Sequence, residues 1–366
     1  MENQFRNLFH KVILNLKNRG IKKTLKKIRN RLNQKIHPLK YPMLTLDEEL
    51  VEISNFHKKN AKKFSSTSVE FVCPFWRGDV LLALQVACTA ALYGKKIRLH
   101  VSKDIFPWIQ DFPYNEYIEI ESLDIKIPDI RDKTKNLNKA IQLVVAKTDF
   151  SGLLVCPLPI RSLTDMEIDL VQFMLLSVGL PIETQLLNIK PLETYNIDYT
   201  EYFGSVSPEN VVLLHPNGGW KTKSMTYNLV KQISDIVHSK NLRIFQIGGS
   251  NDKKFEFLDG FIMRNLSLKI WKKLFTETKA IIGVDSWSAH FASIVNANQA
   301  VVMGCTSSKY VSSKRHYKKQ QGNFIVFESD CENEACFSTN CKYSGENCSG
   351  MKIDSKKLSS WLSDIR

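Results

Sequence analysis

A short apolar run in this chain ends at an acid and a serine, and a histidine follows one helical turn later. Residues 281–284 predict a buried strand, and Asp285 and Ser286 follow it directly. A helix that carries His290 is expected from there to about Asn296. In an open α/β sheet, ligands sit where the carboxyl end of a strand meets the next helix.

The start of such a helix has free N–H groups and a partial positive charge, which suit a phosphate group. Ser286, Ser288 and Ala289 lie in this predicted first turn. A purely structural turn does not need the polar side chains of Asp285 and His290. The segment therefore predicts a nucleotide or nucleotide-sugar site.

A second candidate group lies in the segment W-R-G-D-V-L-L, where Asp79 follows Gly78 at the expected start of a helix. The glycine allows a ligand to approach the backbone closely. The carboxylate of Asp79 can act as a general base on an attacking hydroxyl group. The alternative is a simple helix cap, since Asp is a preferred residue at that position.

Two loops that follow predicted strands carry further candidates. The loop after the strand 211–215 contains Lys221 and Lys223, which can meet a diphosphate, although its spacing is not that of a P-loop. The alternative is a surface loop with solvated lysines. Gly248 and Gly249 form a strand-to-helix turn that can contact a nucleotide, although turns of this kind are common.

Four cysteines near the carboxyl terminus are spaced C-x4-C-x4-C-x6-C in a polar segment, residues 331–348. These are Cys331, Cys336, Cys341 and Cys348. Four thiolates can close a tetrahedral zinc or iron site that folds such a loop. Free reduced thiols are the alternative, with disulfides less favoured in a reducing compartment.

Strand and helix patterns alternate along the chain in two successive series, from 69 to about 178 and from 211 onward. This alternation predicts an α/β fold with two parallel-sheet domains that face each other across a ligand-binding cleft. The expected strands are 69–73, 96–101, 118–121, 153–157, 211–215, 242–247, 281–284, 300–303 and 324–327. A helix is expected at about 252–263. The predicted organisation is an arm at 1–45, a connector at 46–68, an N-terminal domain at 69–200 and a C-terminal domain at 201–366.

The positive charge is concentrated at the amino end. The chain of 366 residues has a net charge of +14, and residues 1–40 alone hold twelve Lys or Arg and one acid. Apolar residues recur there at helical spacing, which predicts two basic amphipathic helices. Three roles stay open: attachment to an anionic membrane surface, packing of a helix on the body of the protein, and an arm that binds tRNA or rRNA.

Composition limits the class of protein. The apolar fraction of 43% is sufficient for packed cores, and no run approaches the roughly 20 apolar residues that a membrane span needs. The amino end lacks the pattern of a signal peptide. These features predict a cytoplasmic protein that lies on the inner face of the cytoplasmic membrane. Because the body is nearly neutral, no nucleic-acid partner is expected.

Taken in order, these motifs resemble those of glycosyltransferase family 9, the ADP-heptose–lipopolysaccharide heptosyltransferase group. The sequence G-D-V-L-L from Gly78, the loop from Pro216 to Lys223, and D-S-W-S-A-H from Asp285 are similar to the family's motifs, and Cys348-Ser349-Gly350-Met351 is similar to its carboxyl end. The resemblance covers the chain from about Val69 to the carboxyl terminus. It implies the GT-B fold, two Rossmann-like domains with the acceptor bound by the first and the donor by the second.

The resemblance also implies roles for the matching residues. Asp79 would be the general base, and Lys223, with Lys221 as a second candidate, would neutralise the donor phosphates. Asp285 would hold sugar hydroxyl groups, while residues 286–289 and His290 would hold the diphosphate. The implied reaction is an inverting transfer that needs no metal ion for its chemistry. Trp287 stands where the family has Gly, and it is expected to reshape the sugar pocket.

Three functions follow. The first is transfer of a sugar, heptose from ADP-heptose being favoured, to lipopolysaccharide or another surface glycan or glycolipid. The second is transfer to a protein, such as an autotransporter adhesin. The third is a non-enzymatic nucleotide- or nucleic-acid-binding protein that uses the basic arm.

Overall fold

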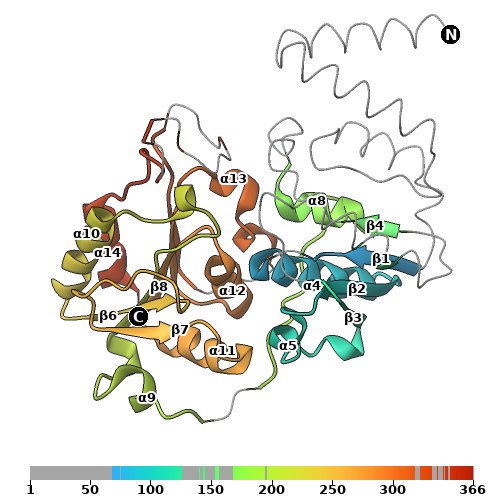
Figure 1. Cartoon of the computed structure of the whole chain (residues 1–366), viewed down its shortest axis with the longest axis horizontal. Coiled ribbons are helices and arrows are strands. Elements are labelled where there is room, and N and C mark those ends of the chain that lie inside the picture. Colours follow the sequence, from blue (N-terminus) through green and yellow to red (C-terminus); the bar gives the residue numbers. More distant parts are fainter. Residues whose placement is uncertain are drawn as a thin grey trace, which may run out of the picture. The chain divides into compact units, whose positions relative to one another are not determined.

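The chain forms two parallel β-sheets with helices packed around them (Figure 1). The computed structural model describes residues 68–74, 76–125, 140, 143–144, 153–155, 168–193, 196–317, 322–331, 336, 341, 343–344 and 347–365. The predicted basic arm, and all of the connector but its last residue, lie outside these ranges. Among the described residues, no helix is both long and apolar enough to cross a membrane.

The first sheet has four strands in the order β3-β2-β1-β4, all parallel. Its strands are β1 (Ser68–Val72), β2 (Lys96–Ser102), β3 (Glu119–Leu123) and β4 (Leu153–Val155). The helices of this part are α4 (Arg77–Leu92), α5 (Phe106–Ile109), η1 (Tyr114–Glu116) and α8 (Leu170–Ser177). Residues 80–90 of α4 are all buried, as expected for a helix that is apolar on every side.

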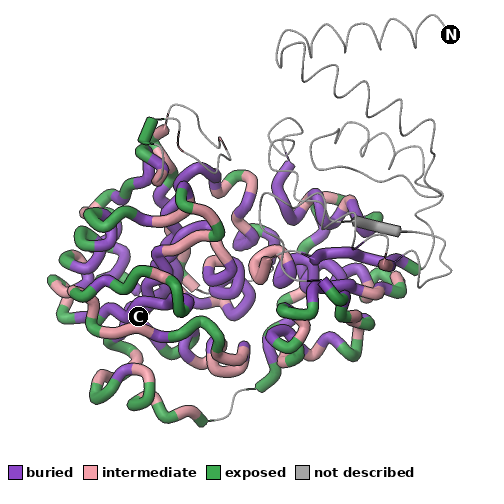
Figure 2. Tube along the Cα trace, viewed as in Figure 1, coloured by how far each residue is buried: buried purple, intermediate pink, exposed green. Residues whose placement is uncertain are grey.

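The second sheet has six parallel strands in the order β10-β9-β8-β5-β6-β7. Its strands are β5 (Val211–His215), β6 (Arg243–Gly248), β7 (Gly260–Met263), β8 (Ala280–Val284), β9 (Gln299–Val302) and β10 (Phe324–Phe327). Every residue of β5 and β8 is buried, which explains their continuous apolar runs (Figure 2). The two parallel sheets predicted from the alternation are therefore present.

Helices of the second part surround its sheet. They are α9 (Thr200–Phe203), η3 (Pro208–Asn210), η4 (Lys221–Lys223), α10 (Tyr227–His238), α11 (Leu268–Glu277), α12 (Trp287–Val295), α13 (Ser308–Val311), η5 (Lys314–His316) and α14 (Ser355–Asp364). Helices α10 and α14 share one apolar core with the central strands, in which Ile233 packs in the same cluster as Trp361. Helix α12 packs against α11 and also against α4 of the first sheet.

The helix expected at 252–263 is absent, and the end of that segment forms strand β7 instead. Tertiary contacts override the local pattern here. The Asp259 carboxylate accepts a hydrogen bond from the Ile244 N–H at 2.8 Å, which anchors the segment beside β6. A Cβ atom at Gly260 would lie 2.6 Å from the Phe245 ring, so only glycine lets the two strands approach closely enough to pair.

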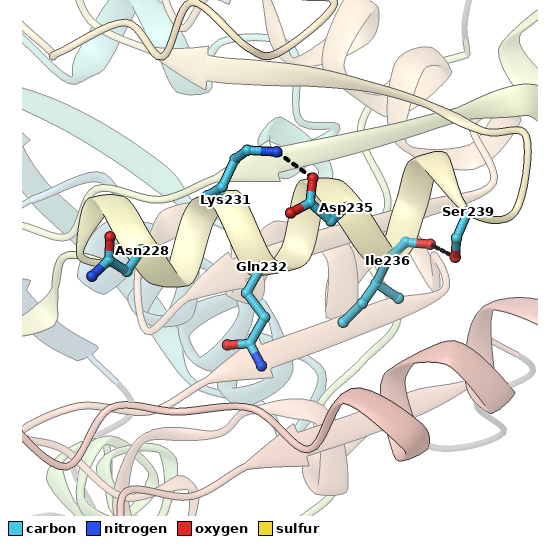
Figure 3. A pocket seen from close by; sticks show the side chains of 6 residues that line it. All are labelled: Asn228, Lys231, Gln232, Asp235, Ile236 and Ser239. Carbon is cyan, nitrogen blue, oxygen red and sulfur yellow. Dashed lines mark hydrogen bonds and ion pairs between the residues drawn. The ribbon is translucent and has the colours of Figure 1, made fainter.

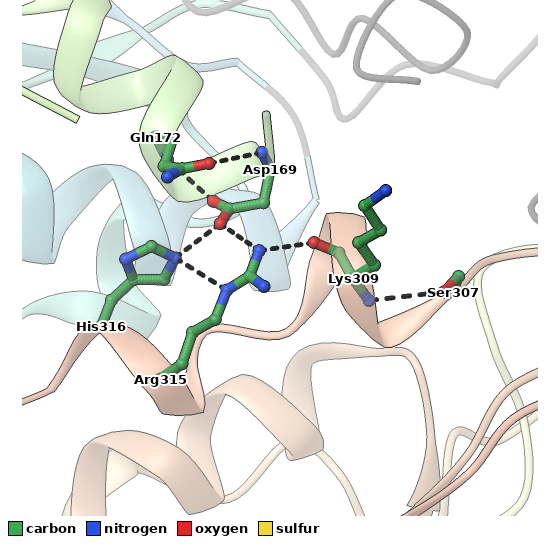
Figure 4. A network of polar contacts seen from close by, with 6 residues as sticks. All are labelled: Asp169, Gln172, Ser307, Lys309, Arg315 and His316. Atoms are coloured by element: carbon green, nitrogen blue, oxygen red, sulfur yellow. Dashed lines mark hydrogen bonds and ion pairs between the residues drawn. The ribbon is translucent and has the colours of Figure 1, made fainter. Parts of the chain in front are cut away.

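A buried carboxylate connects α8 to the segment that follows α13 (Figure 4). Asp169 caps α8 through a reciprocal pair of bonds with Gln172, and its other oxygen accepts from His316 Nε2 at 2.7 Å and from the Arg315 guanidinium. Burial raises the pKa of Asp169, but the His316 hydrogen bond and the neighbouring charges outweigh it and leave the pKa below its usual value. The charged carboxylate is therefore part of the fold.

We expect Asp169→Ala to lower the free energy of unfolding by about 3 kcal/mol, because it removes a cap and leaves a buried histidine and an arginine without their partner. The matched variant Asp354→Ala removes an exposed cap, that of α14, and should lower it by about 1 kcal/mol. Urea unfolding of the two variants measures the difference. Equal losses would show that the buried network adds nothing to the cap.

Candidate functional site

The strand order of the second sheet places the carboxyl ends of β5 and β8 side by side. The chain runs from β5 to β6 and β7 on one side and then returns to β8 on the other, so the sheet reverses its winding between β5 and β8. Ligands of open α/β sheets bind at such a reversal point. His215 ends β5 and is paired in register with Gly283 of β8, which brings it close to Asp285 and Ser286.

A buried ion pair lies at this reversal point. Lys223 Nζ, at the end of η4, donates to Asp285 Oδ2 at 2.5 Å, and Asp285 is only 5% exposed. Burial lowers the pKa of Lys223, but the Asp285 carboxylate outweighs it and leaves the pKa raised. Burial raises the pKa of Asp285, but the Lys223 ammonium group outweighs it and leaves the pKa lowered. The two shifts agree that both groups are charged.

The predicted first turn of the helix lies beside this pair. Ser286 is the residue before α12, but its side chain makes no capping bond to the helix. Its hydroxyl group instead lies 2.8 Å from His215 Nδ1, and the Ser288 hydroxyl lies at the same distance from that atom. The Ser286 side chain, which is at the usual capping position, is thus held by His215. The N–H groups of the first turn of α12 are therefore not capped by Ser286.

His290, one turn into α12, is buried beside the ion pair. Its Nε2 lies 3.9 Å from Asp285 Oδ1, and its Nδ1 lies 3.4 Å from the Ser313 hydroxyl. Burial lowers the pKa of His290 to about 4, even though the Asp285 carboxylate acts in the opposite direction. Burial also lowers the pKa of His215 to about 4, with help from Arg264 and Arg77. Both imidazoles are therefore neutral at pH 7.

A small cavity of about 20 Å³ lies beside His290 and is lined by residues that include Asp285, Ser293 and Gln299. This volume holds about one water molecule and cannot admit a sugar.

Asp79 lies on the other side of the candidate site. It is half-buried in the first turn of α4, and its charge acts on Lys223. A Cβ atom at Gly78 would lie 3.1 Å from the His290 ring and 3.4 Å from the Trp287 backbone nitrogen. Gly78 thus lets the start of α4 pack closely against the start of α12. Asp79, the candidate base, is thereby close enough to act electrostatically on Lys223, the candidate phosphate-binding residue.

The remaining donor-site candidates differ in their burial and in their contacts. Lys221 is exposed, whereas Lys223 contacts Asp285. Gly248 ends β6, and the Gly249 N–H donates to Asp252 Oδ2 at 2.6 Å. Ser288 is buried beside His215, and Ala289 lines the small cavity.

Trp287 lies in an aromatic cluster that joins the two sheets' helices. Its ring centroid is 5.3 Å from that of Trp271 and 5.7 Å from that of Trp108, which follows β2 of the first sheet. His215 and Phe291 also contact the ring, and Trp287 is only 6% exposed. The Trp287 side chain is thus used for packing between α12, α11 and α5.

The cysteine segment adjoins the Lys223 loop through a contact that sequence analysis missed. Asn347 Nδ2 donates to the carbonyl oxygens of Ser224 at 2.9 Å and Lys221 at 3.3 Å. The two carbonyls flank Lys223, so this asparagine fixes the backbone on both sides of it. Only its position next to Cys348 marked Asn347 in the sequence, and nothing in the pattern linked it to residues 123 and 126 positions earlier.

The four cysteines themselves are free thiols in the structure. Hydrogen bonds from Ser344 lower the pKa of Cys341 to about 6, whereas burial raises the pKa of Cys348. Among the residues described, no group of three His, Cys, Asp or Glu side chains is arranged to hold a metal ion. Much of the intervening segment lies outside those residues. The zinc or iron site stays a prediction, which metal analysis of protein purified without added metal tests.

A second hollow lies on the surface of α10 (Figure 3). It is lined by Asn228, Lys231, Gln232, Asp235, Ile236 and Ser239. Lys231 and Asp235 pair with each other one turn apart, so the charges of this helix face are already matched. The hollow offers no group suited to catalysis.

Comparison with known proteins agrees with this geometry at the level of the fold. No protein-family model matches the chain, and no curated protein is similar to it in sequence. Its fold is similar to that of a glycosyl transferase family 9 protein from Veillonella parvula DSM 2008, with a TM-score of 0.52 and 11% identity over 81% of this chain and 97% of that chain. The predicted resemblance to this family is confirmed in the fold.

A further similarity is to the bacterial iron-containing dodecameric glycosyltransferase TibC from enterotoxigenic E. coli H10407, with a TM-score of 0.51 and 12% identity over 74% of this chain. The match spans 65% of TibC, just under two thirds of its length. TibC in complex with ADP-D-beta-D-heptose matches with a TM-score of 0.50. At these identities the comparison defines a glycosyltransferase fold of the GT-B type.

The two neutral histidines predict how stability depends on pH. The unfolded chain takes up protons on both near pH 6.5 and the folded chain only near pH 4, so the free energy of unfolding should fall as pH drops through this window. At about 1.4 kcal/mol per pKa unit, each histidine contributes up to about 3 kcal/mol.

Urea unfolding at several pH values measures this slope. His215→Gln should flatten it, because this substitution removes one of the two buried imidazoles. A free energy of unfolding that is constant from pH 7 to pH 4.5 in the wild-type chain would contradict the assignment of neutral, buried imidazoles.

Proposed function

We propose that this protein is an inverting glycosyltransferase. It would move a sugar from a nucleoside-diphosphate donor, ADP-heptose being favoured, to a hydroxyl group of lipopolysaccharide or another surface glycan. The observation that carries the proposal is the convergence of Asp79, the Lys223–Asp285 pair and the start of α12 at the reversal point of the sheet. The bound ADP-heptose of TibC, a protein of similar fold, supports the choice of donor.

In the proposed reaction, Asp79 accepts the proton of the acceptor hydroxyl as its oxygen attacks the anomeric carbon. The bond between that carbon and the distal phosphate oxygen breaks on the opposite face, so the configuration inverts. Negative charge then develops on the nucleoside diphosphate that leaves. The Lys223 ammonium group and the N–H groups at the start of α12 are placed to stabilise it.

The Lys223–Asp285 pair suits this task because the lysine already has a carboxylate partner before the donor arrives. An ammonium group held in place by Asp285 needs no reorganisation when the phosphate charge develops. The neutral state of His290 adds to this arrangement, since a neutral imidazole beside Asp285 does not compete with Lys223 for the carboxylate. Lys223 and the helix start supply positive charge without a metal ion in the proposed chemistry.

We expect Asp79→Asn to lower the rate of sugar transfer by about 10²- to 10⁴-fold while donor affinity stays within a factor of a few, because the amide cannot accept the proton. Release of ADP from ADP-heptose in the presence of a lipopolysaccharide acceptor measures transfer, and calorimetric titration of ADP measures binding.

The matched control is Asp235→Asn, which removes an exposed carboxylate from α10 and should leave both quantities unchanged. Turnover of Asp79→Asn equal to that of the wild type would overturn the role of Asp79. Loss of ADP binding together with turnover would assign Asp79 to donor binding instead.

A further inference from the structure

Two arginines from opposite sheets meet at the far side of the candidate site from Lys223. Arg77 is the first residue of α4, and Arg264 follows β7. Arg77 Nη1 donates to the Arg264 carbonyl oxygen at 3.0 Å. The Arg264 guanidinium lies over Gly249, where a Cβ atom would come within 2.9 Å of it. The two side chains are thus assembled at the carboxyl ends of β6 and β7.

Neither guanidinium forms an ion pair with a carboxylate among the described residues. Arg77 packs instead over the Trp108 ring, with its guanidinium carbon 4.8 Å from the ring centre. Burial and the positive charge of Arg264 lower the pKa of Arg77 to about 10. Two like charges held together in a partly buried place are unfavourable unless an anion joins them.

An unpartnered buried atom lies at the carboxyl end of the neighbouring strand β5. His215 is 1% exposed, its Nδ1 is taken by the Ser286 and Ser288 hydroxyls, and its Nε2 has no hydrogen-bond partner among the described residues. The charged groups that act on this ring are Arg264, Asp252 and Arg77. When Nδ1 accepts from a serine, Nε2 carries the proton and can donate it to an oxyanion.

Asp252 is the carboxylate at this place, and it already has a partner. Its Oδ2 accepts from the Gly249 N–H, so it holds the turn after β6. The guanidinium groups of Arg77 and Arg264 and the Nε2–H group of His215 can therefore donate hydrogen bonds to one bound anion. Guanidinium groups bind phosphate oxygens in a bidentate manner, which makes Arg the preferred residue for such ligands.

We propose that Arg77, Arg264 and His215 form an anion-binding site for a phosphate-type oxyanion, separate from the Lys223 site. His215 joins the two sites, because its Nδ1 side holds the start of α12 and its Nε2 side is free for this anion. The identity of the ligand rests on the proposed function: it is a second phosphate of the donor nucleotide or an acidic group of the acceptor. Because Arg77 and Arg264 come from different sheets, the bound anion also holds the two sheets together.

Calorimetric titration of the full chain with inorganic pyrophosphate tests this site. We expect Arg264→Gln, at an exposed position that the fold does not need, to weaken pyrophosphate binding on the order of tenfold or more, and Arg77→Lys to weaken it similarly. The control is Arg243→Gln, which removes an equal charge at the opposite end of β6, where Arg243 pairs with Asp259, and should leave the affinity unchanged.

Pyrophosphate that does not bind the wild-type chain, or that binds the Arg264→Gln and Arg77→Lys chains as tightly as the wild type, would overturn the proposal. A repeat titration with saturating ADP, UDP, GDP or CDP identifies the source of the anion: displacement of pyrophosphate assigns the site to the donor, and simultaneous binding assigns it to an acidic acceptor. If nucleotides bind but pyrophosphate binding does not depend on the two arginines, the proposed function stays intact and this site alone is ruled out. If pyrophosphate binding depends on the arginines but no nucleotide binds, the anion site is supported and the proposed function is ruled out.

Discussion

The buried ion pair between Lys223 and Asp285 is the interaction on which the site depends. Removing two charges from water is costly unless close geometry and further hydrogen bonds compensate. The compensation here comes from several elements: β8 delivers Asp285, η4 delivers Lys223, and Asn347 fixes the carbonyl groups on both sides of the lysine loop. Together these elements hold Lys223 and Asp285 in contact without a ligand.

The rest of the local electrostatics follows from that pair. Asp285 carries the negative charge close to Lys223, and the two nearby histidines are kept neutral by burial, so neither adds charge to the centre. Positive charge is supplied on both sides, by Lys223 near β8 and by Arg77 and Arg264 near β6 and β7.

The sequence was most informative where the chemistry and the sheet pattern coincide. The apolar runs predicted β5 with its observed bounds, and Asp285 directly follows β8 as expected. Lys223 lies in the loop after β5, and Asp79 and His290 lie near the starts of α4 and α12, the elements in which they were expected. The Trp that replaces Gly in the family's motif proved to be a packing residue between the sheets' helices, which a local pattern cannot show because its partners Trp108 and Trp271 lie far away in the chain.

Other features depend on contacts between distant segments and were not predictable. The segment at 252–263 has local helical character, but Asp259 and Gly260 fit it to β6 as a strand. His215 was expected only as the end of a strand, because its two serine partners are 71 and 73 residues away. Arg77 was part of a motif, but no pattern could place it beside Arg264, which is 187 residues away.

The central claim is that the Lys223–Asp285 centre holds the phosphates of a nucleotide-linked sugar. The most direct test is the shift in melting temperature of the full chain with ADP, UDP, GDP and CDP, compared between the wild type and Lys223→Gln, each against its own ligand-free value. The account predicts that at least one nucleotide raises the melting temperature of the wild type and that this rise is largely lost in Lys223→Gln. No rise with any nucleotide at millimolar concentration, or an equal rise in both proteins, would contradict it.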